Sequence, residues 1–260
     1  MVLCRIFFID QFVVPGYSMY PTLIKGDRIL VNKFIFGARI YDSFDFSDNS
    51  ILKSHRVKGI RNIRRNDVLV FNFPVNKKTG KIEFKINYVY VKRCIGLPKD
   101  IIEIREGYFI NNNYKSQLGN IFEQSVIHNI PDSLLDNYRM NYNIVDDNNF
   151  EWTIKNFGPI QVPGKGLQIK LDSRAKILYK NIIEYETGRQ ICFDNSLYPF
   201  KKNYYFVCGD NLRDSYDSRH WGFVPEEFII GVVNCISYSR DESDNIIKHR
   251  ILKRLPEINK

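Results

Sequence analysis

The sequence predicts a mainly β protein, in which both ends of the chain form one β core and the middle is inserted as a mixed α+β or β lobe. Short runs rich in Val, Ile, Tyr and Phe, bounded by Gly, Pro, Asp or Asn, dominate both ends. Helical periodicity is scarce. With 260 residues the chain can form one large domain, or one domain that carries a sizeable insertion.

The strand pattern and the composition together predict the domain organisation. The expected strands lie within residues 27–34, 67–73, 88–95, 100–110, 204–210 and 229–239. One helix is expected within residues 130–142, where Asp132 or Ser133 can cap its first turn. The middle is rich in Asn, Tyr and Lys, with weaker apolar alternation. We therefore expect the first part of the core in residues 1–110, the inserted lobe in 111–203 and the second part of the core in 204–260.

The chain is basic, with 38 Lys and Arg residues against 29 Asp and Glu residues and a formal net charge of +9. Such a balance suits nucleic acid, an anionic membrane surface, or no particular partner. Residues 51–66 hold six of the basic residues and no acidic one, so this stretch is either a solvated loop or a contact for anionic lipid. No ribonucleoprotein motif, basic helix or paired Cys/His finger is present, and no nucleic-acid partner is expected.

Metal and disulfide chemistry are not expected. The five cysteines show no CxxC spacing, their number is odd, and the four histidines are scattered. Cys94, Cys208 and Cys235 lie in apolar, strand-like sequence, where a buried thiol is the expected role. We therefore predict neither a metal ligand nor a cofactor.

Ser18 stands in an apolar segment, VVPGYSMYPTL, between Pro15 and Pro21. A serine there either stabilises a turn or acts as a nucleophile, and a nucleophile needs a base from elsewhere in the chain. His220 could complete a Ser-His-Asp triad, but the second glycine of a GxSxG elbow is missing. A lysine is the other candidate, provided that burial lowers its pKa well below the usual value of about 10.4.

Lys92 is the candidate lysine, in the run YVYVKRCIGLP. A strand would place Lys92 on one face together with Tyr88, Tyr90 and Cys94. If that face is exposed, Lys92 is an ordinary surface residue. If the face is buried, the amine loses its hydration and can be neutral. The pattern leaves both possibilities open.

Four segments, in this order, resemble the signature boxes of the type I signal peptidases, which are membrane-bound Ser/Lys proteases that remove signal peptides from exported proteins. VPGYSMYPTL resembles the nucleophile box, IRRNDVLVFNFP a second box, YVKRCIGLPKDII the general-base box and GDNLRDSYDSRHWGFVPEEFIIG the last box. The matches cover both ends of the chain, while residues 111–203 match no specific motif. The resemblance implies a signal-peptidase-type β core.

Carried over position by position, the resemblance implies that Ser18 is the nucleophile and Lys92 its general base. Supporting roles are implied for Ser215, which would bond and orient the lysine amine, for Asp217 and Arg219, which would brace the site, and for Asp210, which would support the turn. The family binds the residues before the cut as an extended strand, with shallow apolar pockets for small side chains. The positions that match the pocket walls are Phe12, Val14, Met19, Leu23, Ile29, Val70, Tyr90 and Val91.

Three departures from the family pattern stand out. Gly16 stands where some members carry a Ser or Thr whose hydroxyl assists the oxyanion hole, so the Ser18 backbone N–H is the donor that remains. Leu212 stands where an arginine is usual. The apolar start of the chain is too short to span a bilayer, whereas the family has a transmembrane helix there. A helix upstream of Met1 is expected, with shallow insertion of the N-terminus as the alternative.

The predicted function is therefore that of a type I signal peptidase that cuts exported preproteins after Ala-x-Ala. The expected location is the cytoplasmic membrane, with the catalytic part on its outer, extracytoplasmic face. The expected partners are the signal peptides of exported preproteins and membrane lipid. Two alternatives stay open: a self-cleaving repressor-type Ser/Lys protease, and a non-catalytic, basic membrane- or nucleic-acid-binding protein with the same fold.

Overall fold

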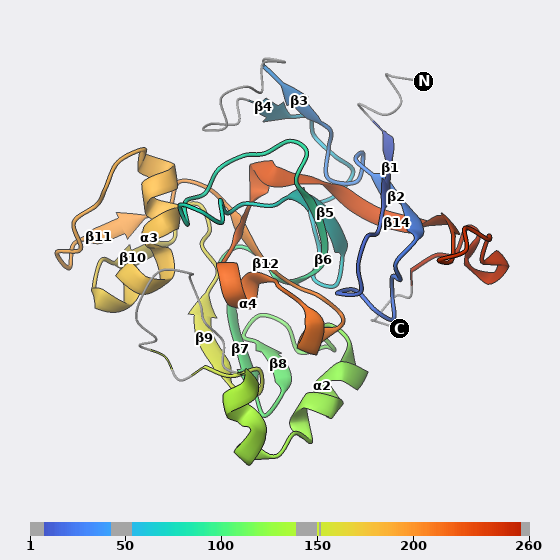
Figure 1. Ribbon diagram of the computed structural model, residues 1–260. Helices are drawn as coiled ribbons and strands as arrows, with labels where there is room; N and C mark the ends of the chain where they lie inside the picture. The colour runs from blue at the N-terminus through green and yellow to red at the C-terminus, as the bar shows by residue number, and fades with distance from the viewer. Residues whose placement is uncertain (1–7, 43–53, 139–149, 151, 256–260) are drawn as a thin grey trace.

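The computed structural model describes residues 8–42, 54–138, 150 and 152–255, which form a mainly β fold (Figure 1). The largest sheet has seven strands in the order β1-β2-β14-β5-β6-β12-β13, and neighbouring strands are antiparallel. Because β14 lies between β2 and β5, the sheet contains strands from both ends of the chain. The strands are β1 (Ile9–Val13), β2 (Asp27–Asn32), β5 (Val68–Asn72), β6 (Val89–Gly96), β12 (Tyr204–Cys208), β13 (Val224–Pro225) and β14 (Ile229–Ser239).

A second sheet, in the order β8-β7-β9, lies at the bottom of the view in Figure 1. Its strands are β7 (Ile101–Arg105), β8 (Tyr108–Asn111) and β9 (Phe157–Gln161). The predicted run 100–110 splits into β7 and β8 because Glu106 and Gly107 have φ angles of 50° and 86°, which turn the chain back on itself. Two small sheets pair β3 (Arg39–Tyr41) with β4 (Ser54–Arg56), and β10 (Gln168–Lys170) with β11 (Leu197–Pro199).

Helices are more extensive than the sequence reading predicted. Within the segment expected to be helical, residues 130–142, a 3-10 helix forms over η1 (Asp132–Tyr138), Ile130 and Pro131 precede it outside any helix, and residues 139–142 lie outside the described part of the chain. The reading missed α2 (Ile121–His128) and the longer α3 (Ser173–Thr187). Helix α3 begins after Asp172, which caps it, and ends at Gly188, whose φ is 68°. The remaining short helices are η2 (Leu212–Asp214), α4 (Ser218–Trp221), η3 (Glu226–Phe228) and η4 (Lys248–Arg250).

The inserted lobe shares its core with the main sheet. One cluster of buried residues extends from Ile102 and Phe157 of the second sheet to Phe206 of β12, and the rings of Phe157 and Phe206 lie 5.9 Å apart. The strands of the second sheet begin at Ile101, ten residues before the expected boundary at residue 111. The division into three parts stays a prediction. As expected, the thiols of Cys94, Cys208 and Cys235 are free and buried, while Cys4 lies outside the described residues.

The C-terminal segment holds the turn that follows β1. Arg250 of η4 forms a buried, two-contact ion pair with Asp27 at the start of β2. The Arg250 guanidinium also donates to the carbonyl oxygen of Thr22 at 3.2 Å. Thr22 belongs to the same turn as Ser18, so the end of the chain helps to fix the position of this turn.

The described part of the chain contains no helix that is long and apolar enough to cross a bilayer. The start of the predicted apolar N-terminus, residues 1–7, lies outside that part.

Candidate active site

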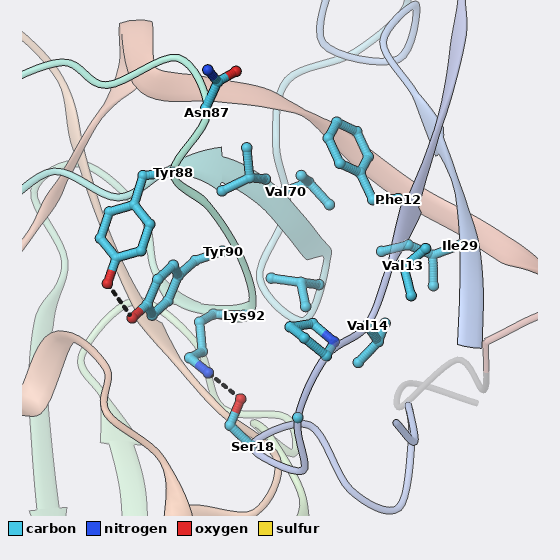
Figure 2. A pocket seen from close by; sticks show the side chains of 14 residues that line it. Phe12, Val13, Val14, Ser18, Ile29, Val70, Asn87, Tyr88, Tyr90 and Lys92 are labelled. Atoms are coloured by element: carbon cyan, nitrogen blue, oxygen red, sulfur yellow. Dashed lines mark hydrogen bonds between the residues drawn. The ribbon is translucent and has the colours of Figure 1, made fainter. Parts of the chain in front are cut away.

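Ser18 and Lys92 are brought together from segments 74 positions apart in the sequence. Ser18 lies in the turn between β1 and β2, and Lys92 lies in the middle of β6. The Lys92 Nζ and the Ser18 Oγ are joined by a hydrogen bond, and both side chains point toward one another at the end of a cleft (Figure 2). A nucleophile and a base within hydrogen-bond reach are the first requirement of a covalent hydrolytic mechanism.

The face of β6 that carries Lys92 is buried from Lys92 onward, whereas Tyr90 is half-buried and Tyr88 is exposed. Lys92 is only 3% exposed, and the rest of β6 after it is buried as well. Burial lowers the pKa of Lys92 from 10.5 to about 8, while the nearby Asp217 carboxylate acts in the opposite direction. A substantial fraction of the amine is therefore neutral near physiological pH.

Asp217 and Arg219 form a fully buried ion pair beside this amine. Arg219 donates from Nε and Nη2 to the two Asp217 oxygens at 2.8 Å each, and the Gly209 backbone N–H donates to Asp217 at 3.0 Å. The guanidinium and the donated hydrogen bonds hold the pKa of Asp217 well below its usual range, against the opposing effect of burial. Asp217 therefore stays ionised, and the pair fixes the start of α4 against the Gly209 backbone.

His220 does not complete a triad with Ser18 in the described structure. Its Nδ1 accepts a hydrogen bond from the Asp217 backbone N–H at 3.4 Å, as part of the capping box at the start of α4. Burial lowers the pKa of His220. The imidazole is a capping group in this fold.

The hydrogen bond expected between Ser215 and the Lys92 amine is not formed. Ser215 is buried as expected, but its Oγ has no hydrogen-bond partner. Ser215 lies close to the Gly209 backbone, because a Cβ added at Gly209 would come within 2.3 Å of both the Ser215 Oγ and the Ser18 carbonyl oxygen. Ser215 thus packs against the Gly209 backbone, and the Lys92 amine is directed at Ser18 instead.

A buried network that the sequence reading missed joins three of the four boxes. Arg93 donates from its Nε to Asp210 at 2.6 Å and makes a second contact from Nη2. The Thr22 hydroxyl donates to the same carboxylate, so the nucleophile turn, β6 and the last box meet at Asp210. Asp210 does more than support its own turn. The adjacency of Arg93 to Lys92 in one box, and of Asp210 to Gly209 in another, is the pattern that could have indicated this network.

The cleft beside Ser18 has a volume of about 430 Å³ and lies between β1 and the first half of β6 (Figure 2). Most of its lining is apolar or aromatic. Six predicted pocket residues line it, namely Phe12, Val14, Ile29, Val70, Tyr90 and Val91. The lining also includes residues that the sequence reading did not single out, namely Val13, Pro15, Asn87, Tyr88 and Val89.

Met19 and Leu23 are not among the residues that line this cleft, and their assignment to the pocket walls stays a prediction. Both are buried in the smaller core cluster, together with Val31 and Val233 of the main sheet. The turn that carries them folds back on itself, and the Leu23 N–H donates to the Met19 carbonyl at 2.9 Å. This turn directs both side chains beneath the nucleophile, where they support the turn from inside.

Gly16 lines the cleft next to Ser18. No heavy atom lies within 4 Å of the place where a Cβ would stand, so this glycine leaves open space at the site. Gly16 has no side-chain donor to offer an oxyanion, and the second donor stays unassigned.

The described geometry combines a mainly β fold with a serine hydroxyl that is hydrogen-bonded to a buried lysine amine. Residues 1–238 match the family model described as signal peptidase, peptidase S26. The chain therefore belongs to the S26 signal peptidase family, and it is a hydrolase.

Curated relatives named signal peptidase I match most of the chain. The protein from Buchnera aphidicola subsp. Baizongia pistaciae is 31% identical over 237 residues, which cover 88% of this chain and 69% of the relative. Signal peptidase I P of Bacillus subtilis subsp. natto is 27% identical over 241 residues, covering 92% of this chain and 82% of the relative. A crystal structure of a signal peptidase I from Enterococcus faecalis V583 is 23% identical, with a TM-score of 0.34, and the match covers 67% of this chain and 98% of that one.

The complete burial of Leu23 predicts a stability effect. Leu23→Ala removes a fully buried side chain and should lower the free energy of unfolding by about 2–5 kcal/mol. Leu197→Ala is the matched control, because Leu197 is 66% exposed and its truncation should change stability by less than about 0.5 kcal/mol. Urea denaturation of the two variants measures the difference, and equal midpoints would contradict the burial of Leu23 in the core.

Proposed function

We propose that this protein is a serine endopeptidase that removes N-terminal signal peptides from exported preproteins after Ala-x-Ala, with Ser18 as nucleophile and Lys92 as general base. Membership of the signal peptidase family supports signal-peptide removal by a serine protease. The observation that carries the finer proposal is the hydrogen bond between Ser18 Oγ and the buried Lys92 amine.

In the proposed mechanism, the neutral Lys92 amine takes the proton of the Ser18 hydroxyl as Oγ attacks the scissile carbonyl carbon. The ammonium so formed returns its proton to the leaving amine when the peptide C–N bond breaks, leaving an acyl ester on Ser18. Lys92 then removes a proton from a water molecule, which attacks the ester carbon. As the ester C–O bond breaks, the ammonium returns this proton to Ser18 Oγ, which releases the signal peptide and restores the neutral amine. The amine must be neutral at the start of each half-reaction, and burial favours this form.

The substrate would bind as an added β-strand. Within the described sheet, β6 pairs with β5 along residues 89–93, but β12 pairs with β6 only at Arg93, Cys94 and Gly96. The first half of β6 therefore presents a free edge to the cleft, opposite residues 12–15. An extended peptide can hydrogen-bond to such an edge, while the apolar lining accepts small side chains of alternate residues. This arrangement suits small residues at the first and third positions before the cut.

The dyad is tested by truncating each partner. Ser18→Ala and Lys92→Ala should each reduce cleavage of a preprotein with an Ala-x-Ala site at least about a thousandfold, because neither group acts without the other. Ser243→Ala and Lys176→Ala are matched controls at exposed positions and should retain full activity.

Gel analysis of precursor and mature product measures the loss, and a substrate with Leu in place of the last Ala should resist cleavage. Cleavage of an added substrate speaks against a strictly self-cleaving protein. Full activity of Lys92→Ala would eliminate the lysine base, and absence of cleavage by the parent protein would favour the non-catalytic alternative.

The pH dependence follows from the pKa of Lys92, which burial lowers to about 8. The active form is the neutral amine, so kcat/KM should rise about tenfold per pH unit below this pKa and level off above it. An amine with its ordinary pKa would still be gaining activity at about pH 10. Initial rates between about pH 6 and pH 10 measure the profile, with circular dichroism at each pH to verify folding. A profile that is flat across this range contradicts a lysine base.

We also propose that the protein acts at the outer face of the cytoplasmic membrane and contacts lipid through an apolar surface patch, defined as Phe8, Phe34, Val57 and Ile60, all exposed. The rings of Phe8 and Phe34 lie 5.8 Å apart, and the Ile60 N–H donates to the Phe34 carbonyl at 3.2 Å, so these segments are adjacent. Lys58 is exposed between Val57 and Ile60. Apolar side chains with a neighbouring cation suit the headgroup region of an anionic bilayer.

Vesicle binding tests this surface. Ile60→Ser should weaken sedimentation with vesicles that contain anionic lipid, whereas Ile246→Ser, at a similarly exposed position outside the patch, should not. Each exposed apolar side chain contributes on the order of 1–2 kcal/mol, which corresponds to a roughly five- to thirtyfold loss of partitioning. Equal binding of the two variants would mean that lipid contact, if any, lies elsewhere.

A further inference from the structure

The first turn of α2, in the inserted lobe, contacts the loop of residues 209–215, which we call the last-box loop. Asn120 caps α2 by accepting hydrogen bonds from the Phe122 and Glu123 backbone N–H groups. The amide nitrogen of the same side chain donates to the Asp210 carbonyl at 3.0 Å. Asn120, the cap of a lobe helix, is therefore hydrogen-bonded to Asp210, the residue whose carboxylate accepts hydrogen bonds from Arg93 and Thr22.

A second contact joins Glu123 to Arg213. Arg213 donates from Nε and Nη2 to the two carboxylate oxygens at 3.2 Å each. The Glu123 side chain is 9% exposed, whereas the Arg213 side chain is 43% exposed. Loss of the ion pair would therefore leave the Glu123 charge buried without a partner, while the Arg213 charge could still be hydrated by water. The position of Glu123 in the first turn of α2 also favours its negative charge.

This pair gives a physical meaning to the departure at Leu212. The Leu212 side chain is buried, and its carbonyl accepts a hydrogen bond from Arg219 at 2.8 Å. The cation that follows it, Arg213, is directed outward to the lobe. Leu212 thus occupies the position where the family usually has an arginine, and the next residue, Arg213, is the arginine that binds the lobe.

The last-box loop in turn contacts the nucleophile segment. The Asn211 backbone N–H donates to the Ser18 carbonyl at 3.1 Å, and its side-chain amide donates to the Tyr17 carbonyl at 3.3 Å. Gly209, two positions earlier, packs against the Ser18 carbonyl and Ser215. A displacement of this loop therefore moves the backbone that carries Ser18 Oγ.

A parallel connection runs through Asn66. Its side-chain oxygen accepts from the Gly119 N–H at 2.9 Å, and its amide donates to the Gln117 carbonyl at 2.8 Å. The Asn66 carbonyl accepts from Arg93 Nη1 at 2.8 Å. The segment that leads into α2 is thus fixed to the neighbour of Lys92, while α2 itself is fixed to the last-box loop.

We propose that the lobe helix α2 sets the position of Ser18 relative to Lys92, and that Glu123 is a positioning residue that acts through Arg213 and the last-box loop. The proposal rests on Ser18 and Lys92 being the catalytic pair. Neither Glu123 nor Arg213 contacts the cleft, so their removal should change the chemical step and leave substrate binding unchanged.

The test is a double-mutant cycle of Glu123→Gln and Arg213→Gln on preprotein cleavage. Each single variant should lower kcat by roughly tenfold with KM unchanged. The decrease in kcat should be larger for Arg213→Gln, because this variant leaves the buried Glu123 carboxylate without a partner. The double variant should be no worse than the Arg213→Gln variant, since the two residues act as a unit. Glu103→Gln is the matched control, because Glu103 forms a two-contact pair with Arg105 on β7 and should retain the parent kcat.

Asn120→Asp tests the second contact without removing the helix cap. Asp caps a helix as well as Asn does, but it has no N–H to donate to the Asp210 carbonyl. This variant should also lower kcat at constant KM, with a thermal midpoint close to that of the parent protein.

The proposal is overturned if folded Glu123→Gln matches Glu103→Gln in kcat, if the single effects add in the double variant, or if KM rises while kcat is unchanged. These outcomes are distinct from failure of the dyad, because an active Ser18→Ala or Lys92→Ala protein would remove the proposed function itself. The pH profile further separates a positioning effect of Glu123 from a failure of the dyad. A positioning effect lowers the plateau rate and leaves the apparent pKa near that of the parent enzyme.

Discussion

The burial of one amine, that of Lys92, sets the requirements that the rest of the site meets. A lysine in water is almost wholly protonated at neutral pH and cannot accept a proton from a serine. Removal of water by β5, β12 and the nucleophile turn lowers the pKa of Lys92 to about 8. The same burial would be unfavourable for any nearby charge that lacked a partner, and Arg93, Asp210, Asp217 and Arg219 are accordingly paired with one another.

Much of the fold could be predicted from the sequence because short runs rich in β-branched and aromatic residues, bounded by turn-forming residues, indicate strands. The runs that became β2, β5, β6, β12 and β14 have this composition; β2 alternates between buried and half-buried residues, whereas β5 and β12 are buried throughout. Helix α3 also carried a readable pattern, since Ala175, Leu178, Tyr179, Ile182 and Ile183 recur at helical spacing after a capping aspartate. The middle was predicted only as a mixed α+β or β lobe, and no helix was assigned to these residues because their polar composition weakened the apolar pattern.

The meeting of Ser18 and Lys92 was expected through family resemblance, and no local pattern fixes it. The roles of the site residues stay predictions. Two details lay beyond sequence reasoning for a physical reason. Whether Met19 and Leu23 face the cleft depends on how a tight turn is oriented, and periodicity says nothing about a turn. Whether the Ser215 hydroxyl reaches the Lys92 amine depends on the relative position of two distant segments, which only three-dimensional contacts define.

The order of strands in the main sheet determines when, during synthesis of the chain, Ser18 and Lys92 can be aligned. Ser18 and Lys92 are both made early, but β14 separates β2 from β5, and Arg250 holds the turn that contains Ser18. A chain that is still growing lacks the strand that joins the two halves of the cleft. Ser18 and Lys92 therefore come into register only after β14 and Arg250 have been synthesised, so a polypeptide that stops before them carries both groups without the contacts that align them.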